Sequence, residues 1–293
     1  MLVILGATLY MVHNSKKPYT FSVSGPRYDN ESIGDVIAIG SVHGDLMAFK
    51  NTLYFNGVIN RSGYWVAGNR TVVQTGDLID KGHNDKKILE FVYNIQEEAL
   101  ENGGEWVQLL GNHEYLNLKG HTHYSVDGPG DDIGFGSQEK RKIEMEEGYL
   151  GQWLRTLPIV YKWKDVVFVH GGIPNIHIAK LGIDNINQMS YDYFNYTESI
   201  SDTKTEILDR ILWDTSLVKS TTNNCKDFYR ILKELKASQM VVGHSLTNKL
   251  GFKSGEIGSH CHGKLKMINT GMSSYYEMIR NRYQGLHIYS FNL

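Results

Sequence analysis

The sequence predicts an α/β fold in which several strands end in loops at a common edge, and three observations support this. Five short apolar runs have the character of β-strands. Each run ends at or beside a glycine, which suits a sharp turn out of a strand. Each turn also carries His, Asp or Asn, and side chains at the ends of parallel strands can meet in one site. The five segments are Val36–Asp45, Val72–Gly82, Val107–Glu114, Val166–Gly172 and Met240–His244.

Helical patterns follow the first two segments. Apolar residues at Leu46, Phe49 and Leu53 recur at helical spacing, and Asp45 stands where a helix N-cap stands. After Gly82 a longer apolar stripe predicts a second helix, which a glycine pair ends. Its stripe comprises Ile88, Leu89, Val92, Ile95 and Ala99, and its end is Asn102-Gly103-Gly104.

The elements farther along the chain are less regular. Residues 117–140 are predicted to form a long loop, since Asp127–Asp132 is rich in Gly, Pro and Asp. The apolar spacing of Leu150–Leu157 predicts a short helix that Pro158 ends. Near the C-terminus, two short apolar runs are expected to be antiparallel strands. They are Lys264–Ile268 and Leu286–Tyr289.

The metal-capable residues extend from about residue 40 to residue 244, so one site needs most of the chain. We therefore expect a single domain over residues 31–293, preceded by an N-terminal segment of residues 1–30. Its apolar part, residues 2–12, is about half the length of a membrane span. We expect this segment to be poorly ordered or surface-packed, with a weak membrane anchor or a signal remnant as the alternative.

Bulk composition excludes some functions. The chain has 293 residues, 41% hydrophobic and 21% charged, with a formal net charge of −2. That charge gives no electrostatic basis for binding nucleic acid or an anionic membrane. The two cysteines, Cys225 and Cys261, form no CxxC pair, so a local thiolate zinc motif is absent. Two unpaired thiols are the preferred interpretation, and one disulfide is the alternative.

His, Asp and Asn together are the ligand set of a hard-to-borderline divalent metal site. Their order here resembles the phosphoprotein-phosphatase branch of the calcineurin-like metallophosphoesterases, whose pattern is GDxHG, GDxxDRG, GNHE, HGG and GH. The resemblance covers roughly residues 35–275. It implies the metallophosphoesterase fold: a four-layer αββα sandwich, in which helices flank two packed mixed β-sheets.

The resemblance also implies a role for each residue. Two divalent metal ions, Mn, Fe or Zn, activate a water molecule and clamp the phosphate. His43 and Asp77 hold the first ion, and Asp77 bridges to the second. The ligands of the second ion are Asp77, Asn112, His170 and His244. His113 protonates the leaving oxygen and Asp80 orients it. Glu114 is interpreted as shaping the loop only.

Softer motifs resemble the Shewanella-like protein phosphatases. They are Gly148–Leu154, His170-Gly171-Gly172, Leu212-Trp213 and Asn269–Tyr276. Several departures from the family pattern occur together. Ser41 stands where the family has a metal-ligating Asp, and a neutral hydroxyl is a poor ligand. Lys81 replaces an Arg that forks onto phosphate, and Asp214 stands where that branch has another.

We expect Lys81, Asn112 and His123 to bind substrate, with His123 near the phosphate on a loop from about Leu118 to Gln138 that lines the cleft. The predicted function is a metal-dependent phosphoester hydrolase, a protein phosphatase whose first metal site Ser41 weakens. Its partner would be a phosphorylated protein or a small phosphoester. A pseudophosphatase that binds a phosphoprotein with little turnover is the alternative. A dinucleoside polyphosphate hydrolase is a minor one. The compartment is cytoplasmic by default, and secretory or membrane-associated if residues 2–12 act as a signal or anchor.

Overall fold

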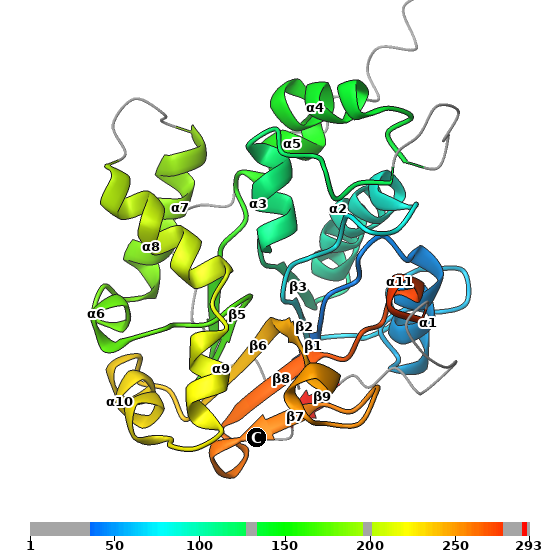
Figure 1. Cartoon of the computed structure of the whole chain (residues 1–293). Helices are drawn as coiled ribbons and strands as arrows, with labels where there is room; N and C mark the ends of the chain where they lie inside the picture. The colour runs from blue at the N-terminus through cyan, green and yellow to red at the C-terminus, as the bar shows by residue number, and fades with distance from the viewer. Residues whose placement is uncertain (1–35, 127–133, 196–200, 278–288, 292–293) are drawn as a thin grey trace, which may run out of the picture.

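The central strands form because short β-branched runs such as Val36–Ile39, Thr71–Gln74 and Val166–Val169 are buried on both faces. The computed structural model describes residues 36–126, 134–195, 201–277 and 289–291 (Figure 1). The proposed N-terminal segment of residues 1–30 therefore lies outside the described residues. The strands are β1 Val36–Ile39, β2 Thr71–Gln74, β3 Glu105–Gln108, β4 Val160–Trp163, β5 Val166–Val169, β6 Gln239–Leu246, β7 Gly258–His260, β8 Leu265–Asn269 and β9 Tyr289–Phe291.

Two mixed sheets result, with the strand orders β3-β2-β1-β9 and β4-β5-β6-β8-β7. In the first sheet β1, β2 and β3 are parallel and β9 is antiparallel. In the second, β5, β6 and β8 are parallel, with antiparallel β4 and β7 at the edges. The central strands are parallel in both sheets, so their carboxyl ends open toward common edges.

Alternate side chains of the strands face two different cores. Val36 and Ala38 belong to a core that also contains Val166 and Phe168 of the second sheet, so the two sheets pack face to face. Their neighbours along the strand, such as Ile37 and Ile39, face helices instead. Two sheets packed between helices are the predicted αββα arrangement, and the α/β fold class is confirmed.

Helices cover the outer faces of both sheets (Figure 1). The described helices are α1 Leu46–Phe55, α2 Asp85–Glu101, α3 Asn112–Leu118, α4 Gln138–Glu147, α5 Tyr149–Leu154, α6 Ile176–Ala179, α7 Ile183–Asn195, α8 Asp202–Leu212, α9 Ser216–Thr221, α10 Lys226–Glu234 and α11 Ser274–Glu277, with 3₁₀ turns η1 Thr247–Leu250 and η2 Cys261–Gly263. Asp45 caps α1 by accepting from the Ala48 N–H at 2.9 Å, as predicted. No described helix is long and apolar enough to cross a bilayer.

The predicted loop after Asn112-His113-Glu114 begins and ends where expected, because α3 ends at Leu118 and α4 begins at Gln138. Residues 127–133 of that loop lie outside the described residues. The same holds for residues 286–288 of the predicted last strand, of which β9 is the described part. Helices α6 to α10 occupy a region for which the sequence pattern gave no assignment.

The interpretation of Cys225 and Cys261 as unpaired thiols is wrong. Their sulfur atoms form a disulfide, with Cα atoms 5.6 Å apart. Cys225 precedes α10 and Cys261 begins η2, 36 residues later. These segments meet only in the folded chain, and no local pattern in the sequence reveals that approach.

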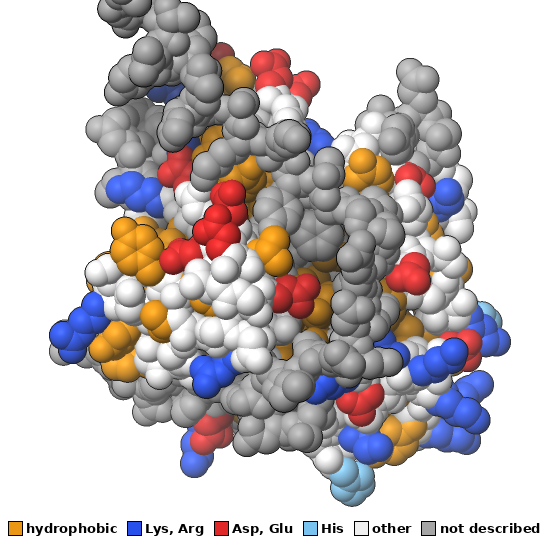
Figure 2. All heavy atoms as spheres, turned by 180° about the vertical axis from the view of Figure 1, so that it is seen from behind, with side chains coloured by type: hydrophobic (Ala, Val, Ile, Leu, Met, Phe, Trp, Pro, Cys, Tyr) orange, Lys and Arg blue, Asp and Glu red, His pale blue; other side chains and the backbone are white. Residues whose placement is uncertain are grey.

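On the rear face, acidic and basic side chains are interspersed (Figure 2), in keeping with the small net charge.

Candidate active site

The site begins with the register of the strands. Ile39 of β1 lies opposite Gln74 of β2, which in turn lies opposite Gln108 of β3. These three strands therefore end level, and the loops that follow emerge side by side. In the second sheet Val169 pairs with Val242 in the same way, and the Gly243 N–H donates to the His170 carbonyl at 2.9 Å.

Several residues at these strand ends have left-handed backbone conformations. The φ angles are +49° at His43, +61° at Asp77 and +46° at His244, and both Asp80 and Lys81 have +69°. Non-glycine residues rarely adopt this region, and such strain persists only where surrounding structure imposes it. Turning the backbone here aims side chains of different strands at one place.

Close loop contacts hold this geometry. Gly76 has φ +92°, and a Cβ on it would lie 2.5 Å from Gly111. The Glu114 carboxylate ties the same loops together, accepting from the N–H groups of Gly111 at 2.9 Å and Asp77 at 2.8 Å. It also accepts from the Leu78 N–H at 2.7 Å. Glu114 thus shapes the loop, in line with its interpretation.

Four side chains converge at the junction of the two sheets. Nε2 of His170 lies 2.8 Å from Oδ1 of Asn112, 3.2 Å from Nδ1 of His244 and 3.3 Å from Oδ1 of Asp77. His170 Nδ1 lies 2.7 Å from the carbonyl oxygen of Thr75. A carbonyl only accepts, so Nδ1 carries the proton and Nε2 presents its lone pair to the cluster.

A cluster of acceptor atoms that face one another is suited to a cation. His170 Nε2 and Asn112 Oδ1 both accept, so neither supplies a proton to the short contact between them. Burial lowers the pKa of His170, and burial together with His170 lowers that of His244 to about 4, so both imidazoles are neutral. Ligand bonds of about 2.0–2.2 Å place neighbouring ligand atoms about 3 Å apart, as these are. The donor set fits one divalent metal ion.

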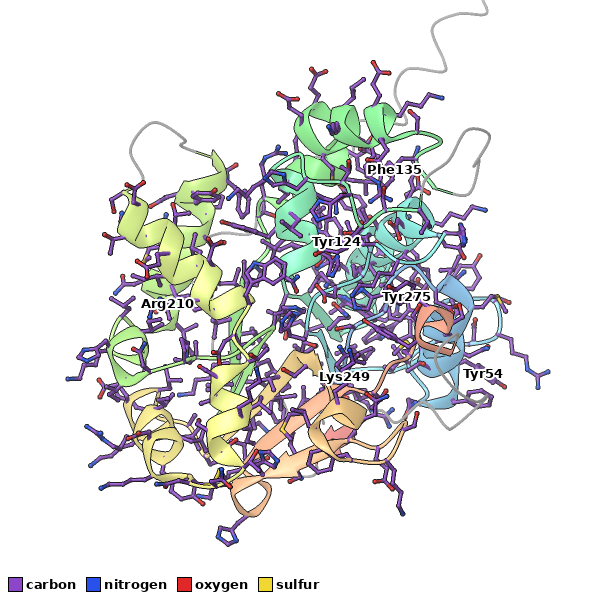
Figure 3. All side chains as sticks on the ribbon, in the orientation of Figure 1. Tyr54, Tyr124, Phe135, Arg210, Lys249 and Tyr275 are labelled. Atoms are coloured by element: carbon purple, nitrogen blue, oxygen red, sulfur yellow. A yellow bond between two sulfur atoms is a disulfide. The ribbon has the colours of Figure 1, made fainter. Side chains whose placement is uncertain are left out.

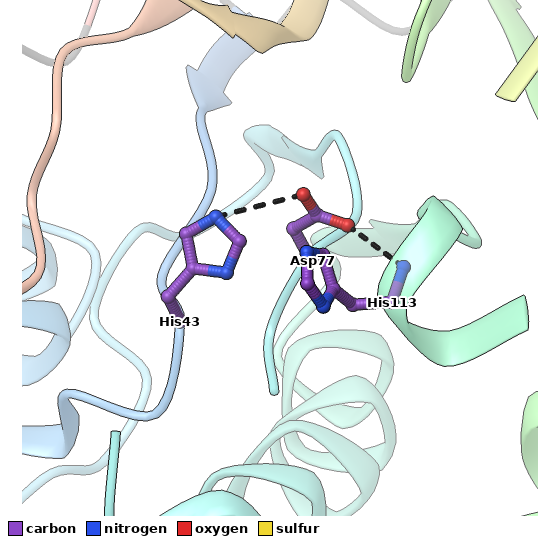
Figure 4. A group of neighbouring side chains, drawn as sticks. All are labelled: His43, Asp77 and His113. Carbon is purple, nitrogen blue, oxygen red and sulfur yellow. Dashed lines mark hydrogen bonds and ion pairs between the residues drawn. The ribbon is translucent and has the colours of Figure 1, made fainter. Parts of the chain in front are cut away.

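A second group shares Asp77. Nε2 of His43 lies 3.6 Å from Oδ2 of Asp77, and His113 contributes a third atom, all within 4.8 Å (Figure 4). Burial lowers the pKa of His43 well below its ordinary value. Ser41, which stands at the position of the family's carboxylate, is 2% exposed. Its hydroxyl has no hydrogen-bond partner among the described residues. This donor set is poorer than the first.

His113 makes a different contact from the other imidazoles. Its Nδ1 lies 2.7 Å from Oδ2 of Asp80, and its ring meets that of His43 edge-on, with centroids 4.9 Å apart. Burial lowers the pKa of His113, but the carboxylates of Asp77 and Asp80 outweigh burial and the net shift is upward. The ring is therefore held as a proton carrier beside the metal-capable cluster.

The sequence of this chain matches the family of calcineurin-like phosphoesterases over residues 33–248. The chain belongs to that family. The resemblance deduced from the strand-end motifs is thus confirmed, and this phosphoesterase is a metallophosphatase by family.

Its relatives share the Shewanella-like character predicted from the softer motifs. The phosphoesterase is 30% identical over 270 residues to Shewanella-like protein phosphatase 1 of Plasmodium berghei, covering 85% of this chain and 70% of that protein. It is 38% identical over 89 residues to Shewanella-like protein phosphatase 2 of Arabidopsis thaliana, covering 30% and 23%. Among solved structures, it is similar to a cold-active protein-tyrosine phosphatase of a psychrophilic Shewanella species. That likeness has a TM-score of 0.69 at 25% identity, covering 82% of this chain and 72% of that one.

Other predicted site residues lie apart from the cluster. His123 is exposed, and its ring packs on Tyr124, whose ring in turn contacts His113 with centroids 5.1 Å apart. The Tyr124 ring thus contacts both His123 and His113. Asp214, which replaces a branch arginine, caps α9 by accepting from the N–H groups of Ser216 and Leu217 at 3.0 and 3.1 Å.

Sequence reasoning missed the buried charges behind His113. Asn117 donates to both carboxylate oxygens of Asp80, at 3.1 and 3.2 Å. Arg141 of α4 is fully buried, forms an ion pair with Asp85, and lies 3.4 Å from Asp80. Asp85 accepts in turn from the backbone N–H of Asp80 at 3.0 Å. Asn117 could have been found as the residue one helical turn after His113, whereas Arg141 is too distant in sequence.

We expect Arg141→Met to be among the most destabilising substitutions in the protein. It leaves Asp80 and Asp85 buried without their cation, and breaking a buried pair from one side costs about 3–5 kcal/mol. Urea unfolding of the metal-free protein measures the effect. The matched control is Arg210→Met on α8 (Figure 3), because Arg210 pairs with Glu206 at 2.7 Å on an exposed surface. That exposed pair contributes at most about 1 kcal/mol. Equal losses in the two variants would contradict this assignment.

Proposed function

We propose that this phosphoesterase removes phosphate from phosphorylated side chains of proteins. The observation that carries the proposal is the His113–Asp80 pair, held at 2.7 Å beside the cluster centred on Asp77. A proton donor next to a divalent-cation site is the arrangement that phosphomonoester hydrolysis needs. The named phosphatases among its relatives support a protein substrate, and the Shewanella structure supports phosphotyrosine among the candidates.

When bound, divalent ions would supply Lewis-acid polarisation of the phosphate and a more acidic water. Asp77, Asn112, His170 and His244 would hold one ion, of Mn, Fe or Zn. The group around His43 and Asp77 offers a poorer ion site, because the neutral Ser41 hydroxyl brings no charge to it.

The protein's own residues then divide the remaining work. Water oxygen bonds to phosphorus while the bond from phosphorus to the ester oxygen breaks. The departing oxygen takes the proton from Nε2 of His113, and Asp80 keeps the ring oriented through Nδ1. Lys81 and Asn112 would bind phosphate oxygens, and His123 would meet the substrate at the edge of the site.

A second candidate is a pseudophosphatase that binds phosphoproteins with little turnover. The Ser41 hydroxyl favours it, since it has no hydrogen-bond partner in the described part of the chain, as does Asp214 at the position of a phosphate-binding arginine. The His113–Asp80 pair favours the hydrolase, since a protein that only binds phosphopeptides has no use for a proton donor beside the cluster.

One experiment separates the two candidates. Purified protein is stripped with a chelator, reloaded with Mn²⁺, and given matched phosphotyrosine and phosphothreonine peptides, with phosphate release and peptide binding measured in parallel. We expect release that disappears on stripping and returns with Mn²⁺. Peptide binding without release, in protein shown to contain metal, would instead establish the pseudophosphatase.

A further inference from the structure

The Lys81 ammonium lies beside the position that a metal ion on His43 would take. Its Nζ is 3.3 Å from Nε2 of His43, and it donates to the Tyr276 hydroxyl at 3.1 Å. The Nδ1 of His43 faces the carbonyl oxygen of Ile79 at 3.4 Å, so Nδ1 is the protonated nitrogen and Nε2 carries the lone pair. The ammonium therefore donates to the same lone pair that would coordinate the first ion.

The position of this ammonium is built into the fold. Lys81 has a left-handed backbone, and its N–H donates to the Tyr124 carbonyl at 3.0 Å. Tyr276 of α11 reaches the site from the far end of the chain and contacts both the ammonium and the His43 ring. The carboxylates of Asp77 and Asp80 face the ammonium and oppose the fall in pKa that burial causes.

The group of residues around His43 also lacks one metal ligand. Ser41 is neutral, buried and unpartnered among the described residues, where a carboxylate would balance a divalent charge. A cation bound at His43 Nε2 would sit within about 2 Å of that atom. It would then lie beside the lysine ammonium, and like charges at such a distance repel strongly in a buried site.

We propose that the Lys81 ammonium replaces the first metal ion, so that the chain binds one divalent ion, at Asp77, Asn112, His170 and His244. Lys81 thereby neutralises Asp77 from the His43 side and presents a single positive charge toward a phosphate. The proposal deepens the proposed function, on which it rests only for the presence of metal at Asp77, Asn112, His170 and His244.

The test measures the number of metal ions bound per chain, independently of catalytic activity. Metal-free protein is titrated with Mn²⁺, the ions per chain are measured by native mass spectrometry, and electron paramagnetic resonance reports whether two Mn²⁺ ions are coupled. Wild type should bind one ion with an uncoupled signal. Ser41→Asp with Lys81→Met should bind two coupled ions. In that double variant the second ion should bind at least tenfold more tightly than in Ser41→Asp alone.

The matched control is Lys249→Met in the Ser41→Asp background. Lys249 (Figure 3) is exposed and lowers the pKa of Lys81 by charge repulsion, so the control removes a nearby charge without freeing the His43 nitrogen. Its second-ion affinity should remain within about threefold of Ser41→Asp. An equal gain with either lysine removed would overturn direct replacement.

Wild type alone also tests the proposal if the double variant does not fold. Two coupled Mn²⁺ ions in wild type at micromolar metal would overturn the inference but leave the proposed hydrolase intact. Protein that binds no divalent ion at all would overturn the proposed function as well. The two failures are therefore distinguishable in one titration.

Discussion

His113→Ala should lower kcat on an aryl phosphate by about 10²–10⁴-fold while leaving the metal content unchanged. The physical reason is that a carboxylate, Oδ2 of Asp80 at 2.7 Å, holds Nδ1 of His113, whereas backbone carbonyls hold Nδ1 of His43 and His170. Without a proton donor, the leaving oxygen must depart as an anion. The loss should accordingly be larger for phenyl phosphate than for dinitrophenyl phosphate, whose leaving group needs no proton.

The control for this substitution is His177→Ala, since His177 is an exposed residue of α6. It should change neither kcat nor metal content. If His113→Ala loses metal in proportion to activity, His113 is a ligand of the His43 group, and its role as proton donor is wrong. A loss that is the same for both leaving groups would point the same way.

Asp77→Asn should abolish metal binding at micromolar supply and lower kcat by more than about 10³-fold. Asp77 is the carboxylate shared by both metal-capable groups, with His43 at 3.6 Å and His170 at 3.3 Å. Even residues behind the ligands change metal affinity by about 10–100-fold, so a shared ligand should matter more. Asparagine keeps the shape and removes the charge.

Thermal unfolding gives a readout independent of turnover. A ligand that binds only the folded state raises Tm as its concentration increases. Wild type should therefore gain stability with added Mn²⁺, and Asp77→Asn should not. The control, Asp184→Asn at an exposed position of α7, should behave as wild type. A Mn²⁺-dependent rise in Tm that persists in Asp77→Asn would place the ion elsewhere.

Some of this site could be predicted because it follows from local pattern. A strand-like run followed by a tight turn places its polar residue at the end of the strand, so Asp77, Asn112 and His170 could be assigned to a common edge before any contact was known. The helix start at Asp45 was equally local, because an N-cap bonds within its own turn. The same locality explains why the boundaries of β3 and β8 were predicted within about two residues.

Other features depend on packing between distant segments. The disulfide between Cys225 and Cys261 was missed because two cysteines 36 residues apart carry no signal of proximity. Arg141 has no motif around it, and only the packing of α4 over α3 brings it to Asp80. The contact of Lys81 with His43 depends on a left-handed backbone conformation at Lys81, which cannot be predicted from the residue type.

The sequence by itself determined which chemistry is available: an ordered set of His, Asp and Asn at strand ends, a serine in place of one carboxylate, and hence the family. Only the tertiary structure decided which of those groups contact one another and which atoms face a bound cation. It orients His170, His43 and His113 through Nδ1, to Thr75, Ile79 and Asp80 respectively, and so fixes where their other nitrogens point. It also seats the Lys81 ammonium against His43. These are effects of distance and direction between residues far apart in the chain, and a linear pattern carries neither.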